Sequence, residues 1–308
     1  MNSLTDSGNE HMPLAPASWA ERNGFSHWAL GLIWLVIGFI LFQVLANLLA
    51  VALVLYQNGM EPGADLMALL LERLDLVFIA NSIGQILFLG LATWFFVRLH
   101  ASRSDRPSFL RLSLSPNTGR MVLLSALLFI VIQPVIWYIG YLNTLLPIPE
   151  TLTELQRSQY EMIENFLRSD GVMWIALFHV AIVPAICEEI MFRGYLQRTF
   201  EKSWGVWPAI LLSGFLFGAY HLQLGNLLPL ATLGILLALV TWLSGSLLPA
   251  MVAHFVNNGG AVLLATFYPD VAFADITPET APPIWMLLIG ILGAIGLIRL
   301  LYNQSETK

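Results

Sequence analysis

Charged residues and cysteine are scarce in this sequence, and both shortages restrict what the protein can be. Only 11% of the 308 residues are charged and 57% are apolar, whereas soluble domains carry about 25% charged and about 45–50% apolar residues. A large soluble core does not account for that difference. The formal net charge of −6 leaves no basic face, so nucleic acid is not a predicted partner. The single cysteine, Cys187, excludes an intrachain disulfide and a Cys-x-x-Cys metal site.

The N-terminus also lacks the pattern of a cleavable signal peptide. Residues 1–26 are polar and contain no basic region followed by a short apolar core. We therefore expect a polar tail over 1–26, with the first membrane span acting as the uncleaved insertion signal. A short tail is predicted at the other end, over 303–308, which leaves 27–302 as the membrane bundle.

Long apolar runs dominate the rest of the chain. A spanning helix needs about 20 mostly apolar residues, and the few charges lie in short stretches between such runs. The predicted fold class is therefore all-α, a polytopic membrane helix bundle with about eight transmembrane helices and the lipid bilayer as its surroundings. The eight predicted spans are 28–56, 75–99, 121–146, 171–192, 206–223, 226–243, 247–267 and 284–302.

Charges in the connecting loops predict how the bundle is oriented. Lys and Arg are enriched in loops on the cytoplasmic side of a membrane. Acidic residues dominate the first, third and seventh loops, where Arg73, Arg157 and Arg168 are the only basic side chains. We therefore predict an integral protein of the plasma (inner) membrane with both termini in the cytoplasm. The basic side of the bundle carries Arg22, Arg98, Arg103, Arg106, Arg111, Arg120, Arg193, Arg198, Lys202, Arg299 and Lys308.

Residues 151–168 have a different pattern from the spans. Apolar residues recur there at roughly helical spacing among charged ones, and Thr151 followed by Glu154 has the form of a capping box. This pattern predicts an amphipathic helix that lies in the outer interface and leads into the fourth span. An ordinary connecting helix that faces solvent is the alternative.

Several polar side chains inside the predicted spans are candidates for chemistry. An ionisable side chain deep in a membrane costs about 2.5–3.5 kcal/mol on insertion scales and usually marks a functional site. Glu188 and Glu189 end the fourth span, His221 lies in the fifth, and His254 and Asn258 lie in the seventh. Structural hydrogen bonds between helices are the alternative for any one of these residues.

Spacing predicts which of these side chains point together. Residues four apart share a helix face, whereas Glu188 points about 100° away from Glu189. The two carboxylates are therefore predicted to have different roles, with Glu189 in a structural ion pair. The predicted pairs are Glu189 with Arg193, Phe217 with His221, and His254 with Asn258.

The fourth and fifth spans are predicted to form a hairpin that turns near Trp204 and Gly205. Glu188 and His221 are then equally far from the turn, about 24 Å along their helices, so the carboxylate and the imidazole can meet. Such a pair in a cavity of low dielectric can polarise a trapped water as a general base. The second histidine, His254, and Asn258 could donate hydrogen bonds to a developing oxyanion.

Three motifs in the sequence resemble those of a known family. Glu188-Glu189-x-x-x-Arg193, Phe217-x-x-x-His221 and His254-x-x-x-Asn258 follow one another on separate predicted membrane helices. This arrangement resembles the CPBP family, which contains the type II CAAX prenyl endopeptidases and bacterial Abi-type homologues. The resemblance covers a catalytic core of about 171–268.

The resemblance implies a glutamate-dependent intramembrane endopeptidase without a metal cofactor. It implies that Glu188 and His221 activate water and that His254 and Asn258 form the oxyanion site. Glu189, Arg193 and Phe217 would be supporting residues. The implied partner is a membrane-associated or lipid-modified peptide or protein substrate.

Other functions fit the same residues. Glu188, His221 and His254 are a plausible set of zinc ligands, so a zinc metalloprotease is one alternative, although the sequence lacks His-Glu-x-x-His. A non-catalytic membrane scaffold or immunity protein is a second. A transporter is a third, but no symmetric halves or pair of broken helices are evident in the sequence.

Overall fold

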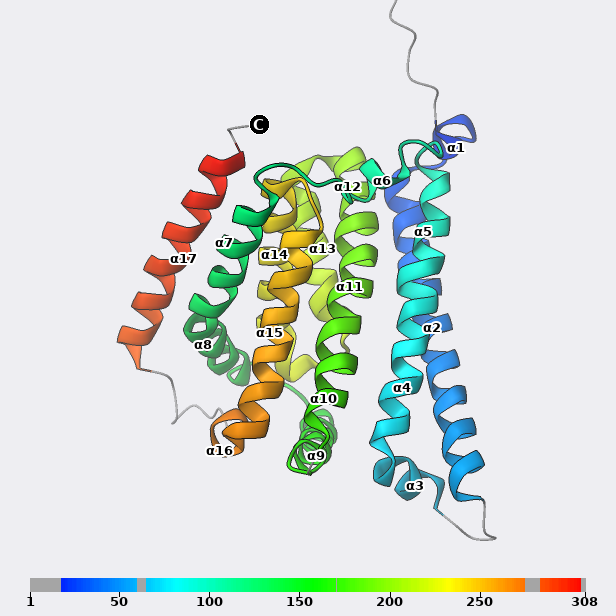
Figure 1. Ribbon diagram of the computed structural model, residues 1–308, viewed down its shortest axis with the longest axis vertical. Helices are drawn as coiled ribbons and strands as arrows, with labels where there is room; N and C mark the ends of the chain where they lie inside the picture. The colour runs from blue at the N-terminus through cyan, green and yellow to red at the C-terminus, as the bar shows by residue number, and fades with distance from the viewer. Residues whose placement is uncertain (1–17, 60–64, 170, 275–282, 306–308) are drawn as a thin grey trace, which may run out of the picture.

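The computed structural model describes residues 18–59, 65–169, 171–274 and 283–305, and no strand occurs in these ranges. Long helices stand side by side, and short helices and connections lie at the two ends of the bundle (Figure 1). The predicted all-α membrane bundle is therefore confirmed.

Within the described residues, six stretches of helix are long and apolar enough to cross a membrane. A seventh is the pair α7 (Thr118–Val131) and α8 (Gln133–Thr144), which meet at a bend of 45°. The fifth predicted span, α13 (Val206–Tyr220), is helical but has only 15 residues, or about 22 Å. That is shorter than the roughly 30 Å hydrocarbon core. The six stretches are His27–Gln57, Leu74–Leu99, Met173–Trp204, Leu224–Ser244, Leu248–Phe267 and Ile284–Ser305.

The helix boundaries follow the predicted spans except in the fourth, where the helical stretch continues past the predicted end at 192 to Trp204. Three segments inside the long stretches are irregular. Two long stretches contain π-helical turns, which are rare and often occur at functional sites. Two of the three π-helical segments, η3 and η4, lie on either side of α11, the helix that carries the paired carboxylates. In chain order the elements are α2 (His27–Asn58), α4 (Leu74–Gly84), η1 (Gln85–Ala92), α5 (Thr93–Phe96), η2 (Val97–Leu99), α10 (Met173–Ala176), η3 (Leu177–Ile182), α11 (Val183–Glu189), η4 (Ile190–Leu196), α12 (Gln197–Trp204), η5 (Leu224–Asn226), α14 (Leu227–Ser244), α15 (Leu248–Phe267) and α17 (Ile284–Ser305).

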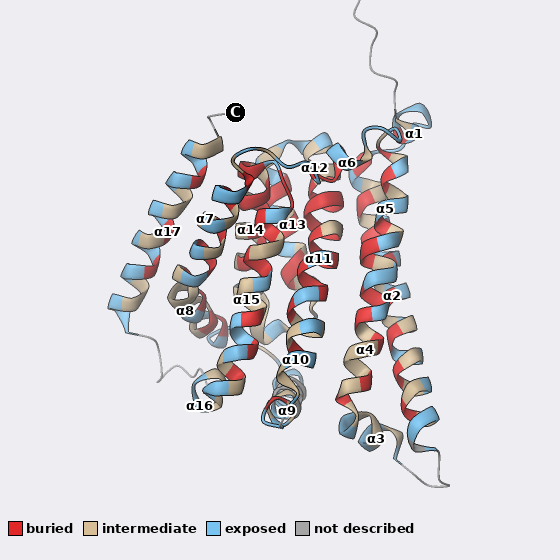
Figure 2. Cartoon of the chain, in the orientation of Figure 1, coloured by how far each residue is buried: buried red, intermediate tan, exposed pale blue. Residues whose placement is uncertain are grey.

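Burial is concentrated in the middle of the bundle. The helices α11, α13, α14 and α15 lie between α2 and α4 on one side and α7, α8 and α17 on the other. Figure 2 shows most of the buried residues on this central group, whereas α17 at the edge is largely exposed. The motif residues are therefore carried by the best-packed helices of the protein.

The hairpin before the central helices turns where the sequence predicts. Helix α12 ends at Trp204 and α13 begins at Val206, and Gly205 between them has a φ of 83°, which favours glycine. Helices α13 and α14 then pack with their backbones almost in contact. A Cβ atom on Gly214 would lie 2.5 Å from the backbone nitrogen of Ile235, so only glycine allows this approach.

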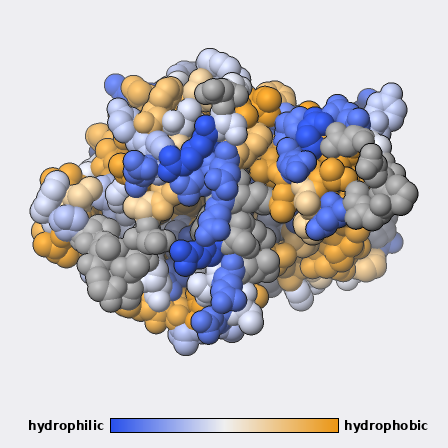
Figure 3. Space-filling model, turned by 90° about the horizontal axis from the view of Figure 1, so that it is seen from below, coloured by the Kyte–Doolittle hydropathy of each residue, from blue (hydrophilic) through white to orange (hydrophobic). Residues whose placement is uncertain are grey.

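Helix α9 (Glu150–Leu167) is the amphipathic helix that the sequence predicts. Its residues Ile163, Phe166 and Leu167 pack against α10 and α15. Figure 3, which views this end of the protein, shows a band of hydrophilic surface with apolar surface on both sides. The side chains of Leu155 and Met162, which are part of the predicted pattern, lie outside the described residues.

The predicted capping box at Thr151 and Glu154 is wrong. Helix α9 begins at Glu150, two residues earlier than this box requires, and no side chain caps its N-terminus after Pro149. Proline has a φ that suits the start of a helix, so Thr151 already lies inside the first turn. A capping box is present instead between Ser18 and Glu21 at α1 (Trp19–Arg22), within the predicted polar tail.

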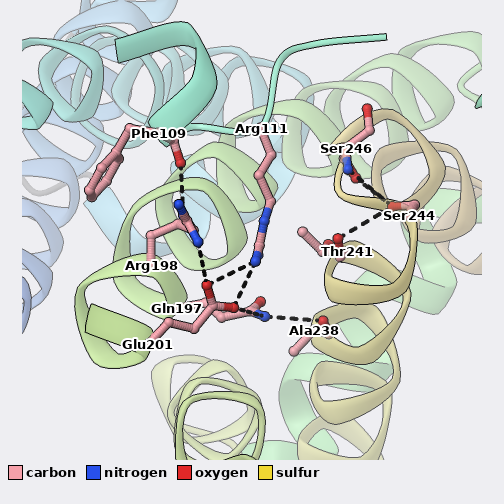
Figure 4. A network of polar contacts seen from close by, with 9 residues as sticks. All are labelled: Phe109, Arg111, Gln197, Arg198, Glu201, Ala238, Thr241, Ser244 and Ser246. Atoms are coloured by element: carbon pink, nitrogen blue, oxygen red, sulfur yellow. Dashed lines mark hydrogen bonds and ion pairs between the residues drawn. The ribbon is translucent and has the colours of Figure 1, made fainter. Parts of the chain in front are cut away.

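A buried ion cluster holds the end of α12 to its neighbours (Figure 4). Arg111, in the connection before α7, donates from Nη2 to both carboxylate oxygens of Glu201, at 2.9 and 2.8 Å. Arg198 donates to the same carboxylate at 2.7 Å, and Gln197 links it to the Ala238 carbonyl of α14. The cluster therefore joins three segments that are distant in sequence.

The described segments of the basic and acidic loops lie at opposite ends of the bundle. The connection that contains α6 (Arg106–Phe109) lies at one end with α1 and α12, whereas α3 (Leu66–Glu72), α9 and α16 (Pro269–Ala272) lie at the other. The C-terminal end of α17 lies at the same end as α1. This arrangement agrees with an even number of membrane crossings. The cytoplasmic orientation itself stays a prediction.

Cysteine labelling tests the orientation. A cysteine in place of Asp65, the N-terminal cap of α3, should react with an impermeant thiol reagent in intact cells. A cysteine in place of exposed Ser104 should react only after the cells are permeabilised. The native Cys187 is buried and should contribute little background. Labelling of the Ser104 variant alone would invert the orientation.

Candidate active site

The two adjacent carboxylates on α11 have different surroundings. Glu189 is fully buried and Glu188 is 6% exposed. Oε1 of Glu189 bonds two partners, whereas the buried Oε2 atoms of both glutamates have no hydrogen-bond partner. The hydroxyl of Tyr220, which is within electrostatic range of Glu188, is also buried without a partner. Burying a carboxylate without a partner is costly, and among the described residues Glu188, unlike Glu189, has no ion pair that accounts for its burial.

Glu189 is the centre of a buried ionic network. Its Oε1 accepts hydrogen bonds from Nη1 of Arg193 at 3.0 Å and from Nδ1 of His254 at 2.8 Å. Arg193, which is fully buried, also donates from Nη2 to the Gly234 carbonyl of α14 at 3.0 Å. The ring of Phe217 lies 4.3 Å from its guanidinium carbon. The spacing predicts the contact with Arg193, but not the contact with His254.

The hydrogen bonds of His254 set its protonation pattern. Its Nδ1 faces the Glu189 carboxylate, which only accepts, so this nitrogen carries a proton. Its Nε2 lies 3.2 Å from Nδ2 of Asn258, and the same Nδ2 donates to the Val180 carbonyl at 3.0 Å. Because a carbonyl only accepts, Val180 determines which end of the Asn258 amide faces His254. His254 is therefore neutral, with Nε2 as an acceptor.

The Val180 carbonyl can accept a hydrogen bond from Asn258 because a proline lies four residues later in the helix. In a continuous α-helix, this carbonyl would accept from the backbone N–H of residue 184. That residue is Pro184, which has no N–H. The break in the helix ladder next to η3 thus provides a backbone acceptor for Asn258.

His221 carries a proton on the same ring nitrogen as His254. Its Nδ1 lies 2.8 Å from the Phe217 carbonyl and donates to it, so in the neutral imidazole Nε2 is the acceptor. The Phe217 ring also contacts the rings of His221 and His254, with centroids 4.9 and 5.7 Å apart. Phe217 therefore packs between the two histidines.

A small cavity of about 30 Å³ lies between these side chains. A buried water needs roughly 10–15 Å³ of cavity volume, so this cavity has room for about two waters. Glu188 is not among its lining residues, so the predicted contact between Glu188 and His221 is not present in this structure. The cavity is lined by Phe129, Phe217, His221, Leu230, Leu233, Leu237, His254, Asn257 and Asn258.

Two side chains at the site were not assigned roles from the sequence. Asn257 lines the cavity, and Gln133 at the start of α8 donates to it at 3.1 Å. Gln133 lies outside the three motifs. The only signal for it is a polar residue followed by proline inside an apolar span.

The structure also bears on nucleophiles and metal ligands. Cys187 is a free thiol in an apolar cluster, where it packs near Gly90. In the part of the chain that the structure describes, no three His, Cys, Asp or Glu side chains are grouped to hold one metal ion. Catalysis without a metal stays a prediction.

Substituting each carboxylate in turn should separate their structural roles. We expect Glu189→Gln to destabilise the protein by about 3–5 kcal/mol, because it leaves the buried charge of Arg193 without its partner. Glu188→Gln is the matched control and should keep its thermal midpoint, since no ion pair is lost. The measurement is thermal unfolding of the purified variants in one detergent. Equal destabilisation by both substitutions would contradict the division of roles.

Comparison with known proteins agrees with the motifs. Residues 170–260 match the family model of the type II CAAX prenyl endopeptidase Rce1-like proteins, and this segment contains every motif residue. No curated protein and no solved structure is significantly similar to the chain. The resemblance to the CPBP family is therefore confirmed over 170–260, the segment in which the chain is similar to the Rce1-like endopeptidases.

Proposed function

We propose that the protein is a glutamate-dependent intramembrane endopeptidase that cleaves a membrane-associated or lipid-modified peptide. The observation that carries the proposal is the convergence of the three motifs. Motif side chains of α13 and α15 line a cavity with room for about two waters, and Glu189 of α11 bonds to His254 in its wall, within a helical membrane protein. A peptide with a prenylated C-terminal CAAX sequence is the first substrate to test, because the Rce1-like family is described by that substrate.

His221 and Glu188 would activate the attacking water. His221 lines the cavity, and its Nε2 can accept a proton from a water held there. The water oxygen then bonds to the scissile carbonyl carbon, and the proton later passes to the leaving amine. Glu188 has a buried carboxylate oxygen without a partner, but its side chain must move towards the cavity when the substrate binds. Catalytic contacts often shorten in this way in the substrate complex.

Glu189, Arg193, His254 and Asn258 would form the fixed wall of the site. The family resemblance implies that His254 and Asn258 bind the oxyanion. In this structure the N–H groups of both side chains already bond Glu189, Val180 and His254 itself. The pair therefore reaches an oxyanion only if one of these bonds is exchanged.

Loss of the Glu188 carboxylate tests the proposed function. We expect Glu188→Gln to lower the turnover of a quenched fluorescent, farnesylated CAAX peptide by more than about 10²-fold, since general base catalysis alone contributes 10²–10⁴-fold. Glu161→Gln, on the exposed surface of α9, is the matched control and should leave turnover unchanged.

A second readout covers substrates of another kind. In cells, the Glu188→Gln variant should cause an uncleaved precursor to accumulate, which comparative proteomics of the membrane fraction can detect. Near-normal turnover by Glu188→Gln would refute its catalytic role. Absence of any cleaved peptide or precursor would instead favour the non-catalytic scaffold.

Metal content separates the proposed mechanism from the zinc alternative. We expect purified protein to hold much less than one zinc per chain and to keep its activity after treatment with a chelator. Under the zinc alternative, stoichiometric zinc would be present and His254→Ala would release it. Elemental analysis and activity measured on the same preparations decide between the two.

A further inference from the structure

The hydrogen-bond donors around the cavity can be counted one by one. His221 gives its Nδ1 proton to the Phe217 carbonyl, and His254 gives its Nδ1 proton to Glu189. Asn258 uses its amide nitrogen for both the Val180 carbonyl and His254. An Asn amide has only two N–H donors. These three polar side chains therefore have no N–H left for a bound substrate in this arrangement.

Asn257 is the remaining polar residue of the cavity wall, and its amide is only partly used. One N–H donates to Oδ1 of Asn258 at 3.1 Å, and its own Oδ1 accepts from Gln133 at 3.1 Å. Among the described residues, no acceptor takes the second N–H. Two residues of the cavity wall thus keep an unused group, an acceptor at Nε2 of His221 and a donor on the Asn257 amide.

Gln133 determines which way the Asn257 amide points. Its Nε2 donates to the Phe129 carbonyl at 2.8 Å and to Oδ1 of Asn257. Because the carbonyl only accepts, the amino end of Gln133 must face both groups, and Asn257 must present its oxygen there. Gln133 begins α8 directly after the 45° bend that follows α7, and its bond to Asn257 joins this bend to α15. The amino end of Asn257 is consequently turned towards Asn258, on the cavity wall.

We propose that Asn257 donates the hydrogen bond that stabilises the oxyanion during peptide hydrolysis, and that Gln133 is the residue that positions it. The proposal rests on the endopeptidase function proposed above. When the water oxygen bonds to the scissile carbon, the carbonyl oxygen gains the negative charge. This oxygen then accepts a hydrogen bond from the unused N–H of Asn257. When the carbon–nitrogen bond breaks, the carbonyl re-forms and the amine leaves with the transferred proton. His221 thus accepts a proton and Asn257 donates a hydrogen bond in the same cavity.

Replacing Asn257 tests the donor directly. Asn257→Ala should lower kcat for the farnesylated CAAX peptide by about 10²–10³-fold, the cost of losing one oxyanion donor, with KM and the thermal midpoint little changed. Asn257→Asp keeps the shape and the acceptor for Gln133 but has no N–H, and it should show the same loss. Asn47→Ala, an exposed asparagine on α2 that bonds only within its own helix, is the matched control.

A double-mutant cycle tests the role of Gln133. Gln133→Met should lower kcat by about 3–10-fold, the worth of one neutral hydrogen bond that holds the amide in place. Combined with Asn257→Ala it should cause no further loss, because Gln133 acts through Asn257. Additive losses would show that Gln133 acts independently and would overturn its positioning role.

The outcomes distinguish this inference from the proposed function. If the wild-type protein cleaves the peptide in a Glu188-dependent manner while both Asn257 variants stay within threefold of wild-type kcat, the donor assignment is overturned and the peptidase stands. A lower thermal midpoint with unchanged kcat would likewise show that Asn257 contributes only to packing. If the wild-type protein hydrolyses no peptide, both proposals fail.

Discussion

The ion pair between Glu189 and Arg193 is the interaction on which the rest of the site depends. Both side chains are fully buried, so neither charge has water as an alternative partner. The pair also bonds His254 of α15 and the Gly234 carbonyl of α14, and the ring of Phe217 of α13 lies over the guanidinium. The partners of these two charges come from the four central helices. The same buried ion pair therefore holds the helices together and fixes the geometry of the site.

Backbone carbonyls give direction to the polar side chains of the site. The carbonyls of Phe129, Val180 and Phe217 each accept from a Gln, Asn or His side chain whose other end is thereby defined. Two of these contacts lie next to breaks in helices, at Pro134 and Pro184. Irregular helix geometry thus serves to orient amides and imidazoles that would otherwise have two equivalent arrangements.

Sequence patterns predicted the local features well and the distant ones less well. Apolar runs located the helices, and the i to i+4 spacing predicted the contact between Glu189 and Arg193, because both depend on residues close in the chain. The contacts of His254 with Glu189 and of Gln133 with Asn257 join helices far apart in sequence, and no periodicity reports them. The capping box predicted at Thr151 failed for a local reason, since Pro149 caps α9 two residues earlier.

The short helix α13 has a consequence for the supply of water to the bundle. It ends at Tyr220, and Leu222 just beyond it has a φ of 55° and is exposed, so the chain leaves helical geometry close to the site. Polar backbone groups in non-helical segments must be buried in protein or meet water at such depths. A helix of about 22 Å is shorter than the roughly 30 Å hydrocarbon core, so one of its ends lies within that core or the bilayer adapts to it. Hydrolysis consumes one water per bond, and water that meets the non-helical backbone after Tyr220 would lie next to His221.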